Sequence, residues 1–323
     1  PQASRTLWER VCGLPGQKLL TTHSPYFVQH VPLRDLRIMR LVNGRTRVAS
    51  MPARVVSTAP WNEKVAKLAE HSGGRISQDP DTSRVAATGW ISEQLATGLA
   101  GCWKGDVAEA EHRAAVMQLR HAARILVLPG EEQELGFAGR RVRGEIFFAR
   151  RWALVEGVCE HLLLHAMGRA LDYPLDAHGV AVIDFQNNGN ASIYPSLATA
   201  FEIPWRMVTD GDAESVKFRK QLRGRGFTDA ELDARMTALP APRDLEDQLL
   251  ADGHEALLRE ILTEGGDARA ASLSIEDLTR RLKNQKTEYM HGLAERVSRD
   301  AGLANRMPQA MLDLVTWLRS NTP

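Results

Sequence analysis

The stretch Ala153-Leu154-Val155-Glu156-Gly157 decides the fold that the sequence predicts. It is a short apolar run that ends in a carboxylate. Two further apolar runs follow, at residues 179–183 and 205–208, with helical patterns between them. Short apolar runs that alternate with helical patterns are typical of parallel strands joined by helical crossovers. We therefore predict an α/β fold in which helices flank a parallel sheet, plus a mainly helical domain.

Carboxylates follow two of these three runs. Glu156 closes the first run, and Glu160 lies one helical turn later, so both carboxylates can share one helix face. Asp210, Asp212 and Glu214 alternate after the third run, a spacing that points side chains the same way in an extended segment. Ligands collect at the carboxyl ends of the strands in such sheets, so we expect the two clusters to meet.

Five converging carboxylates repel one another unless cations neutralise them. Oxygen ligands suit Mg²⁺ or Mn²⁺ better than zinc, and two such ions can support phosphodiester hydrolysis. Taken singly, a glutamate at a strand end is most often an exposed helix N-terminal residue, and Asp-x-Asp is most often a turn or a helix cap. The joint occurrence of both around one strand–helix–strand unit favours a site for two divalent ions.

The composition is that of an ordinary globular protein. The 323 residues suffice for two or three domains, and 43% are apolar and 25% charged. The three cysteines are far apart and lack metal-binding spacing, which predicts reduced thiols in a cytoplasmic protein. No uninterrupted apolar run of about 18 residues occurs, so we expect no membrane span.

Net charge gives no guide to partners, because 41 Lys and Arg balance 40 Asp and Glu. Basic clusters nevertheless surround the acidic ones, which suits a polyanionic substrate over a metal site, although each cluster alone is equally explained as a solvated face. The clusters comprise Arg140, Arg141, Arg143, Arg150, Arg151, Lys217, Arg219, Lys220, Arg223 and Arg225.

The N-terminal part contains Thr21-Thr22-His23-Ser24-Pro25 after a short apolar run that we expect to form a buried strand. This segment resembles the final strand and switch histidine of ABC-type ATPase domains, which implies that His23 lies near the γ-phosphate there. A helix-capping or turn role is the alternative. No G-x-x-x-x-G-K-[ST] loop occurs, so ATP would bind only through a missing part of such a domain. Because the chain starts at Pro1, we expect it to be a fragment of a longer protein.

Leu154-Val155-Glu156-Gly157 and Asp210-Gly211-Asp212 resemble the two acidic motifs of the Toprim domain, and Glu214 stands where many members have a third acid. The spacing from Glu156 to Glu160 is similar to that of OLD-family (overcoming lysogenisation defect) nucleases, which join an ABC-type ATPase to a Toprim domain. The resemblance implies a metal-dependent endonuclease that nicks or cleaves DNA, and a homodimer or higher homo-oligomer. It also implies the site residues: Glu156, Glu160, Asp210, Asp212 and Glu214 as ligands of two Mg²⁺ or Mn²⁺ ions, with Glu156, Asp210 and Lys286 as catalytic residues.

Other positions are open to two interpretations. The resemblance places a catalytic lysine in residues 283–294; we choose Lys286 over Lys283, and a solvated helix face is the alternative. Glu246 resembles an acidic element of the family, but we favour a helix N-terminal residue. The polar loop at residues 185–190 could lie near substrate. His161 and His165 are assigned to the surface or to packing, because no third soft ligand is near them in the sequence.

We predict four segments. Residues 1–56 would be the C-terminal remnant of an ATPase domain, with strands near 36–41 and 46–49, and residues 57–137 a helical connector. Residues 138–227 would form the Toprim core. Residues 228–323 would be helical and complete the nuclease module, with helices at 229–239, 244–263, 274–299 and 308–320.

Three other functions are compatible with parts of the pattern. A topoisomerase- or primase-like Toprim enzyme is one, although a topoisomerase needs a nucleophilic tyrosine, and none of the four has a convincing context. A phosphatase that uses Asp-x-Asp is another, but that motif normally follows the first strand. The third is a non-catalytic module for DNA binding or dimerisation.

Overall fold

The computed structural model describes residues 2–138, 144–187 and 190–320. Arg140, Arg141 and Arg143 of the predicted basic clusters lie outside these residues. The chain divides into two compact units. The first comprises residues 1–148, 189–203 and 218–234, and the second comprises residues 149–188, 204–217 and 235–323. Two internal segments thus group with the N-terminal part, and the four predicted domain boundaries stay a prediction.

The first unit begins with the helices α1 (Gln2–Gly13) and α2 (Pro25–Val28) and the antiparallel hairpin β1 (Ile38–Val42) and β2 (Arg45–Ala49). Both predicted strands of the hairpin form. The predicted buried strand before His23 is wrong, because residues 17–24 form neither helix nor strand and Leu19 is 93% exposed. Two leucines flanked by polar residues offer too little apolar surface to bury a strand.

A small antiparallel sheet lies where the sequence predicted a helical connector. The strand order is β3-β5-β4, and helix α5 contacts β3. Helices also form in this segment, but the sheet was not expected, because its buried strand β5 consists largely of Val and Ala, and alanine is uncommon in strands. The elements are β3 (Val55–Pro60), α3 (Glu63–Glu70), β4 (Ile76–Gln78), β5 (Arg84–Ala87), α4 (Glu93–Gly101), α5 (Glu109–Ala123) and α6 (Pro129–Ala138), and the later helices α8 (Ile193–Ala200) and α10 (Asp229–Asp233) also belong to this unit.

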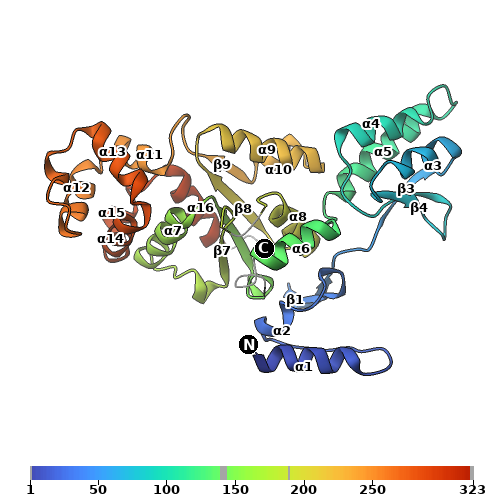
Figure 1. Cartoon of the computed structure of the whole chain (residues 1–323), viewed down its shortest axis with the longest axis horizontal. Helices are drawn as coiled ribbons and strands as arrows, with labels where there is room; N and C mark the ends of the chain where they lie inside the picture. The colour runs from blue at the N-terminus through green and yellow to red at the C-terminus, as the bar shows by residue number, and fades with distance from the viewer. Residues whose placement is uncertain (1, 139–143, 188–189, 321–323) are drawn as a thin grey trace. The chain divides into compact units, whose positions relative to one another are not determined.

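The second unit contains a four-stranded parallel sheet in the order β7-β6-β8-β9 (Figure 1). Three of its strands are the predicted ones: β6 (Arg151–Val155), β7 (Val180–Asp184) and β8 (Trp205–Thr209). The register places Leu154 of β6 beside Ile183 and Met207, so the carboxyl ends of the three strands lie at one edge. The fold class is therefore α/β with a parallel sheet flanked by helices, as predicted.

The fourth strand, β9 (Met236–Ala238), corrects the helix predicted at residues 229–239. Helix α10 ends at Asp233, and β9 then pairs with the edge of β8, with Met236 beside Met207. Pairing with β8 outweighs the helical pattern of the sequence at this point. The open edge of β8 offers backbone hydrogen bonds to the three residues of β9, which can adopt an extended conformation.

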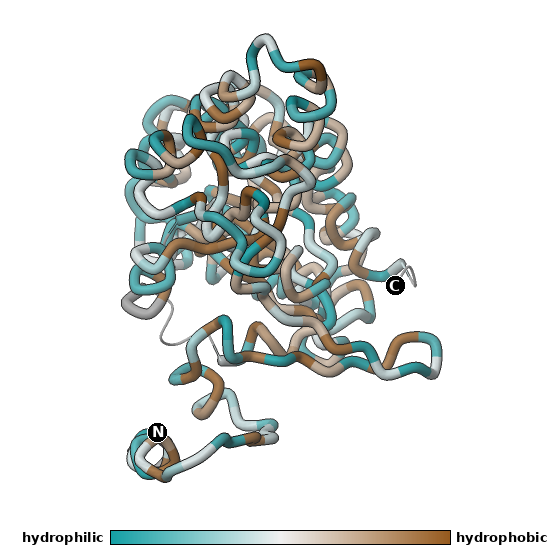
Figure 2. The backbone as a smooth tube through the Cα atoms, turned by 90° about the vertical axis from the view of Figure 1, so that its right-hand side faces the viewer, coloured by the Kyte–Doolittle hydropathy of each residue, from teal (hydrophilic) through white to brown (hydrophobic). Residues whose placement is uncertain are grey.

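Helices surround this sheet and share one hydrophobic core with it. Helix α7 contacts β7 and α14, and α16 contacts β8 and α7; Figure 1 shows α11–α15 gathered beside α7. Figure 2 shows hydrophobic and hydrophilic residues mixed along the helical turns, as expected of helices with one buried face. The helices are α7 (Val158–Ala170), α11 (Leu245–Ala251), α12 (Glu255–Glu264), α13 (Ile275–Asn284), α14 (Lys286–Arg299), α15 (Ala301–Ala304) and α16 (Gln309–Arg319).

Two predicted helices are each split in two. The helix at 244–263 divides at Gly253, whose φ of +85° ends α11, and the helix at 274–299 divides at Gln285. Helix α9 (Ala213–Arg225) begins in a segment of the second unit and ends in a segment of the first. No described helix is both long and apolar enough to cross a membrane.

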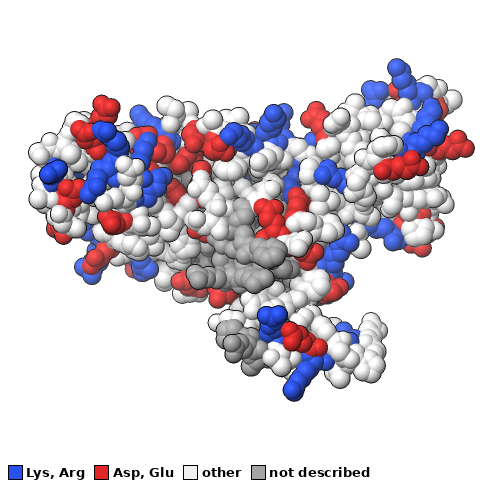
Figure 3. Space-filling view, viewed as in Figure 1, with Lys and Arg blue, Asp and Glu red and all other residues white. Residues whose placement is uncertain are grey.

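Several side chains of the predicted basic clusters form ion pairs within the protein. Arg219 pairs with Asp229 and Asp233, and the buried Arg225 pairs with Glu131. Figure 3 shows Lys and Arg interspersed with Asp and Glu over the visible face of the C-terminal helices.

Arg151 gives a test of this structural use. Its guanidinium donates hydrogen bonds to the carbonyl oxygens of Trp317 and Leu318, both at 2.7 Å, and to that of Ser320. It thus provides donors for carbonyl groups at the C-terminal end of α16, which have no partner within the helix. Arg151→Met should lower the free energy of unfolding by about 1.5–3 kcal/mol, as expected for hydrogen bonds to a charged group.

The matched control is Arg150→Met, because Arg150 is exposed. Urea denaturation should place this variant within about 0.5 kcal/mol of the parent. Equal stability of the two variants would contradict the role of Arg151.

Candidate metal centre at the carboxyl ends of the strands

Glu156 ties the ends of three strands together. It follows β6 and is only 4% exposed. Its Oε1 accepts a hydrogen bond of 2.7 Å from Nε2 of Gln186, which follows β7, and its Oε2 accepts one of 3.0 Å from the main-chain nitrogen of Asp210, which follows β8. Burial raises the pKa of Glu156, these hydrogen bonds oppose the rise, and the charge of Asp212 adds to it.

Glu160 lies in the first turn of α7, four residues after Glu156. Its Oε2 accepts a hydrogen bond of 2.9 Å from the main-chain nitrogen of Gly157, so the carboxylate caps its own helix. The side chain is 7% exposed. Burial, together with the negative charges of Glu246 and Glu156, raises its pKa to about 7.

Asp210 is the most perturbed carboxylate of the cluster. Burial raises its pKa to about 8, and the charges of Glu160 and Glu156 add to the effect. Its Oδ1 is buried and has no hydrogen-bond partner. A buried, unsatisfied carboxylate oxygen among other carboxylates is an unfavourable arrangement that a cation would relieve.

Asp212 and Glu214 lie farther along the same loop. Asp212 Oδ1 accepts hydrogen bonds from the main-chain nitrogens of Glu214, at 2.8 Å, and Ser215, at 3.3 Å, so it caps the start of α9. Glu214 forms an ion pair with Lys217. The charge of Asp212 acts on Glu156, whereas a ligand role for Glu214 stays a prediction that its ion pair with Lys217 does not favour.

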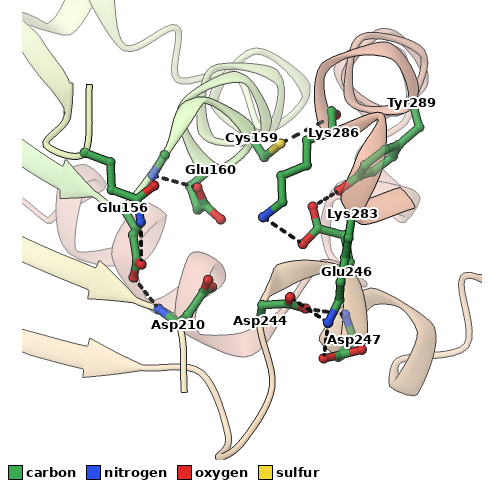
Figure 4. A network of polar contacts seen from close by, with 12 residues as sticks. Glu156, Cys159, Glu160, Asp210, Asp244, Glu246, Asp247, Lys283, Lys286 and Tyr289 are labelled. Carbon is green, nitrogen blue, oxygen red and sulfur yellow. Dashed lines mark hydrogen bonds and ion pairs between the residues drawn. The ribbon is translucent and has the colours of Figure 1, made fainter. Parts of the chain in front are cut away.

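Helices α11 and α14 bring a further acid and a lysine to the cluster (Figure 4). Glu246 is 1% exposed, and its Oε1 accepts a hydrogen bond of 2.8 Å from the Tyr289 hydroxyl. Nζ of Lys286 lies 3.4 Å from Glu246 Oε2, and its charge acts on Glu156 as well. Glu246 is therefore inside the cluster and not an ordinary exposed residue at a helix N-terminus.

Lys283 is held away from these acids by a different pair. Its Nζ lies 2.8 Å from Asp244 and 2.9 Å from Asp247, and hydrogen bonds to both raise the pKa of Lys283 against the effect of burial. Of the two lysines, Lys286 is the one whose ammonium group faces the buried acids.

The donor set fits a hard divalent cation. All the converging groups are carboxylates, burial and neighbouring charges raise the pKa values of Glu156, Glu160 and Asp210, and Asp210 Oδ1 lacks a hydrogen-bond partner. Within residues 2–138, 144–187 and 190–320, however, no three His, Cys, Asp or Glu side chains are arranged to hold a metal ion. Glu156 and Glu160 are instead directed toward backbone and amide donors, so metal binding would require their carboxylates to reorient.

The sequence did not reveal three of the residues that shape this centre. Glu246 and Asp244, whose charges both add to the raised pKa of Asp210, come from α11 and its N-cap, where acidic residues are equally explained by helix capping. Gln186 belongs to the polar loop after β7, and only the parallel register shows that it reaches Glu156. Asn188 and Gly189 of that loop lie outside the described residues.

Comparison with known proteins identifies the type of domain that these strands form. Residues 147–212 match the family model described as "Overcoming lysogenization defect protein-like, TOPRIM domain". These residues, most of which lie in the second unit, are thus a Toprim domain. It is of the OLD-like type, as the sequence motifs indicated. The match includes Glu156, Glu160, Asp210 and Asp212, whereas Glu246 and Lys286 lie beyond it.

Individual relatives are more distant. Over 112 residues, 34% of this chain, the sequence is 31% identical to "Uncharacterized protein YbjD" of Escherichia coli (strain K12), and the match spans 20% of that protein. Among solved structures, the chain is similar to the C-terminal region of the Xanthomonas campestris pv. campestris OLD protein, with 21% identity, a TM-score of 0.40, and coverage of 54% of this chain and 97% of that one. The C-terminal region of the Burkholderia pseudomallei OLD protein gives 22% identity and a TM-score of 0.37, covering 53% and 98%.

Gly211 provides a test of how the loop after β8 is held. A Cβ at this position would lie 2.5 Å from the carbonyl oxygen of Leu239 and 2.7 Å from that of Pro240, in the loop after β9. Gly211→Ala should therefore push Asp210 and Asp212 away from that loop and cost about 1–3 kcal/mol of stability, as overpacking does.

Gly224→Ala is the matched control, because nothing lies within 4 Å of its Cβ position and it is in helix α9. Calorimetric melting should show this variant to be at least as stable as the parent, since alanine favours a helix by up to about 1 kcal/mol. Equal melting temperatures for both variants would contradict the close approach at Gly211.

The raised carboxyl pKa values predict that metal-free protein loses stability as the pH rises. A group whose pKa is higher in the folded state binds more protons there than in the unfolded chain, so its stabilising effect is present near pH 4 and disappears as the pH approaches the folded pKa, about 8 for Asp210. Asp210→Asn should make the protein more stable at pH 8 by at least about 1.4 kcal/mol, the equivalent of one pKa unit, since solvent screens part of the shift.

Guanidinium denaturation at pH 5.5 and pH 8 in EDTA measures this effect. Glu288→Gln, an exposed change on α14, should keep the pH dependence of the parent. A parent protein that is more stable at pH 8 than at pH 5.5, with Asp210→Asn unchanged from it, would refute the prediction.

Proposed function

We propose that this chain provides the cleavage centre of a Mg²⁺- or Mn²⁺-dependent DNA endonuclease. The observation that carries the proposal is the half-buried Asp210, which shares its surroundings with acids from two other elements and has a buried oxygen without a hydrogen-bond partner. Glu156, Glu160, Asp210 and Asp212 would hold the ions, with Glu246 as a further candidate. Divalent ions bound there would activate a water molecule and stabilise the leaving oxygen of a phosphodiester.

Lys286 supports a role with a phosphate substrate. It stands at the start of α14 with its side chain half exposed, and Glu246 and Tyr289 fix its surroundings. An ammonium group in this position can offset the negative charge that develops on a phosphate during cleavage. Because hydrogen bonds and charge hold Glu246 in place, Lys286 is positioned before any substrate binds.

Three of the four tyrosines do not favour a topoisomerase-like reaction, whereas Tyr26 is half exposed. Tyr289 is buried and donates its hydroxyl hydrogen to Glu246, while Tyr173 donates to the carbonyl oxygen of Leu318 and stacks on His178. Tyr194 is 1% exposed. These three hydroxyls are not available as nucleophiles, and hydrolysis by water is the simpler proposal.

The remaining parts of the proposal concern the whole protein. The matched segment covers only a fifth of its E. coli relative, so coupling to ATP through a preceding ATPase domain and assembly into a homo-oligomer remain proposals. DNA as the partner is supported by the Toprim domain, and the cytoplasm as the compartment by the free cysteines.

A plasmid assay tests the nuclease. Supercoiled DNA incubated with the chain and Mn²⁺ or Mg²⁺ should become nicked or linear, and Glu156→Gln or Asp210→Asn should abolish this. Lys286→Met should slow cleavage by about 100-fold while metal binding persists, since it removes transition-state stabilisation and no ligand.

Asp313→Asn, an exposed carboxylate change on α16, is the control and should cleave like the parent. Circular dichroism of each variant shows that loss of cleavage does not reflect loss of folding. Intact plasmid with both metals, or unchanged cleavage in Asp210→Asn, would overturn the proposal.

A further inference from the structure

A second group of possible ligands lies outside the carboxylate centre, in a groove of about 660 Å³ between α7 and α14. Three histidines line the groove: His161 and His165 from α7, and His291 from α14. The sequence separates His291 from the other two by well over a hundred positions, so only the packing of α14 on α7 brings them to one groove.

The two histidines of α7 are already close together. They are spaced i, i+4 on one helix face, and their ring centroids lie 4.8 Å apart. Nδ1 of His161 is buried and has no hydrogen-bond partner. A buried ring nitrogen without a hydrogen-bond partner costs free energy, and coordination of a cation would offset that cost.

The charges around the groove are compatible with a cation. Burial lowers the pKa of His165, so its ring is neutral near pH 7 and keeps the lone pair that a metal ligand needs. The carboxylate of Asp176 acts on both rings of α7, and Glu295 also lines the groove. Arg169 is the opposing cation at the rim, where its side chain is exposed to solvent.

We propose that His161, His165 and His291 form a binding site for a late first-row transition metal ion, represented by Zn²⁺. Imidazole nitrogens suit Zn²⁺, Ni²⁺ and Cu²⁺, whereas Mg²⁺ prefers the oxygens of the carboxylate centre. In the part of the chain that the structure describes, no three His, Cys, Asp or Glu side chains are arranged to hold a metal ion, so the site would form when the exposed side chain of His291 rotates toward the pair.

Such an ion would join α7 and α14, the helices that carry Glu160 and Lys286 of the carboxylate centre. His161 directly follows Glu160 on α7, and His291 lies on α14 together with Lys286. A ligand that binds only the folded state stabilises it, so zinc should raise the melting temperature of the chain. The site does not depend on the proposed nuclease function, because its donors and its expected metal are different.

Calorimetric titration of the untagged full chain with Zn²⁺ tests the proposal. Excess Mg²⁺ is kept present to compete at the oxygen ligands, and the titration is repeated on the doubly substituted Glu156→Gln, Asp210→Asn chain. We expect one zinc ion per chain in both cases. His161→Gln or His165→Gln should weaken binding at least ~tenfold, equal to about 1.4 kcal/mol, and His291→Gln should weaken it by a smaller factor.

The matched control is His178→Gln, because His178 stacks on Tyr173 and does not line the groove. It should bind zinc like the parent and show the same zinc-dependent rise in melting temperature, which His165→Gln should lose. The proposal fails if the doubly substituted chain binds no zinc. It also fails if zinc binds that chain equally well with and without His161 and His165.

Discussion

Mutual repulsion among buried carboxylates is the constraint on which this centre depends. Parallel strands place their carboxyl ends at one edge, and each of β6 and β8 is followed there by an acid. Glu156 is held by donors from the segments after β7 and β8, so the same side chain that adds charge also joins three strand ends. The fold can keep these acids together for two reasons. Hydrogen bonds and the ammonium group of Lys286 offset part of their negative charge, and the raised pKa values of Glu160 and Asp210 favour the neutral, protonated carboxyl groups.

The helices beyond the sheet complete the arrangement from the other side. Helix α14 packs on α7 in the shared core, and Gly292 permits a close approach to α12, where a Cβ would lie 2.6 Å from Ile261 Cγ2. The same helix carries Lys286 and Tyr289 to Glu246, and His291 to the groove beside α7. The packing of α14 thus brings one lysine to the carboxylate centre and one histidine to the groove.

Neighbouring basic residues of this chain have different roles, because some are bonded within the protein and others are exposed to solvent. Arg151 follows the exposed Arg150 directly, yet its guanidinium is bonded to the end of α16. Arg219 and Arg225 are likewise paired with acids of the protein. A run of arginines in a sequence is therefore weak support for nucleic-acid binding until the tertiary structure shows which guanidinium groups remain exposed.

The sequence by itself determined the parallel-sheet fold, three of its four strands and the acidic motifs, because apolar runs and the acids that end them are local patterns. It did not determine β9, the break at Gly253, or the small sheet of the first unit, because strand pairing and helix breaks there depend on distant partners. It also left the role of Glu246 open and gave His161 and His165 no third ligand. Only the packing of α11 and α14 decided those points, since it joins residues that are far apart along the chain.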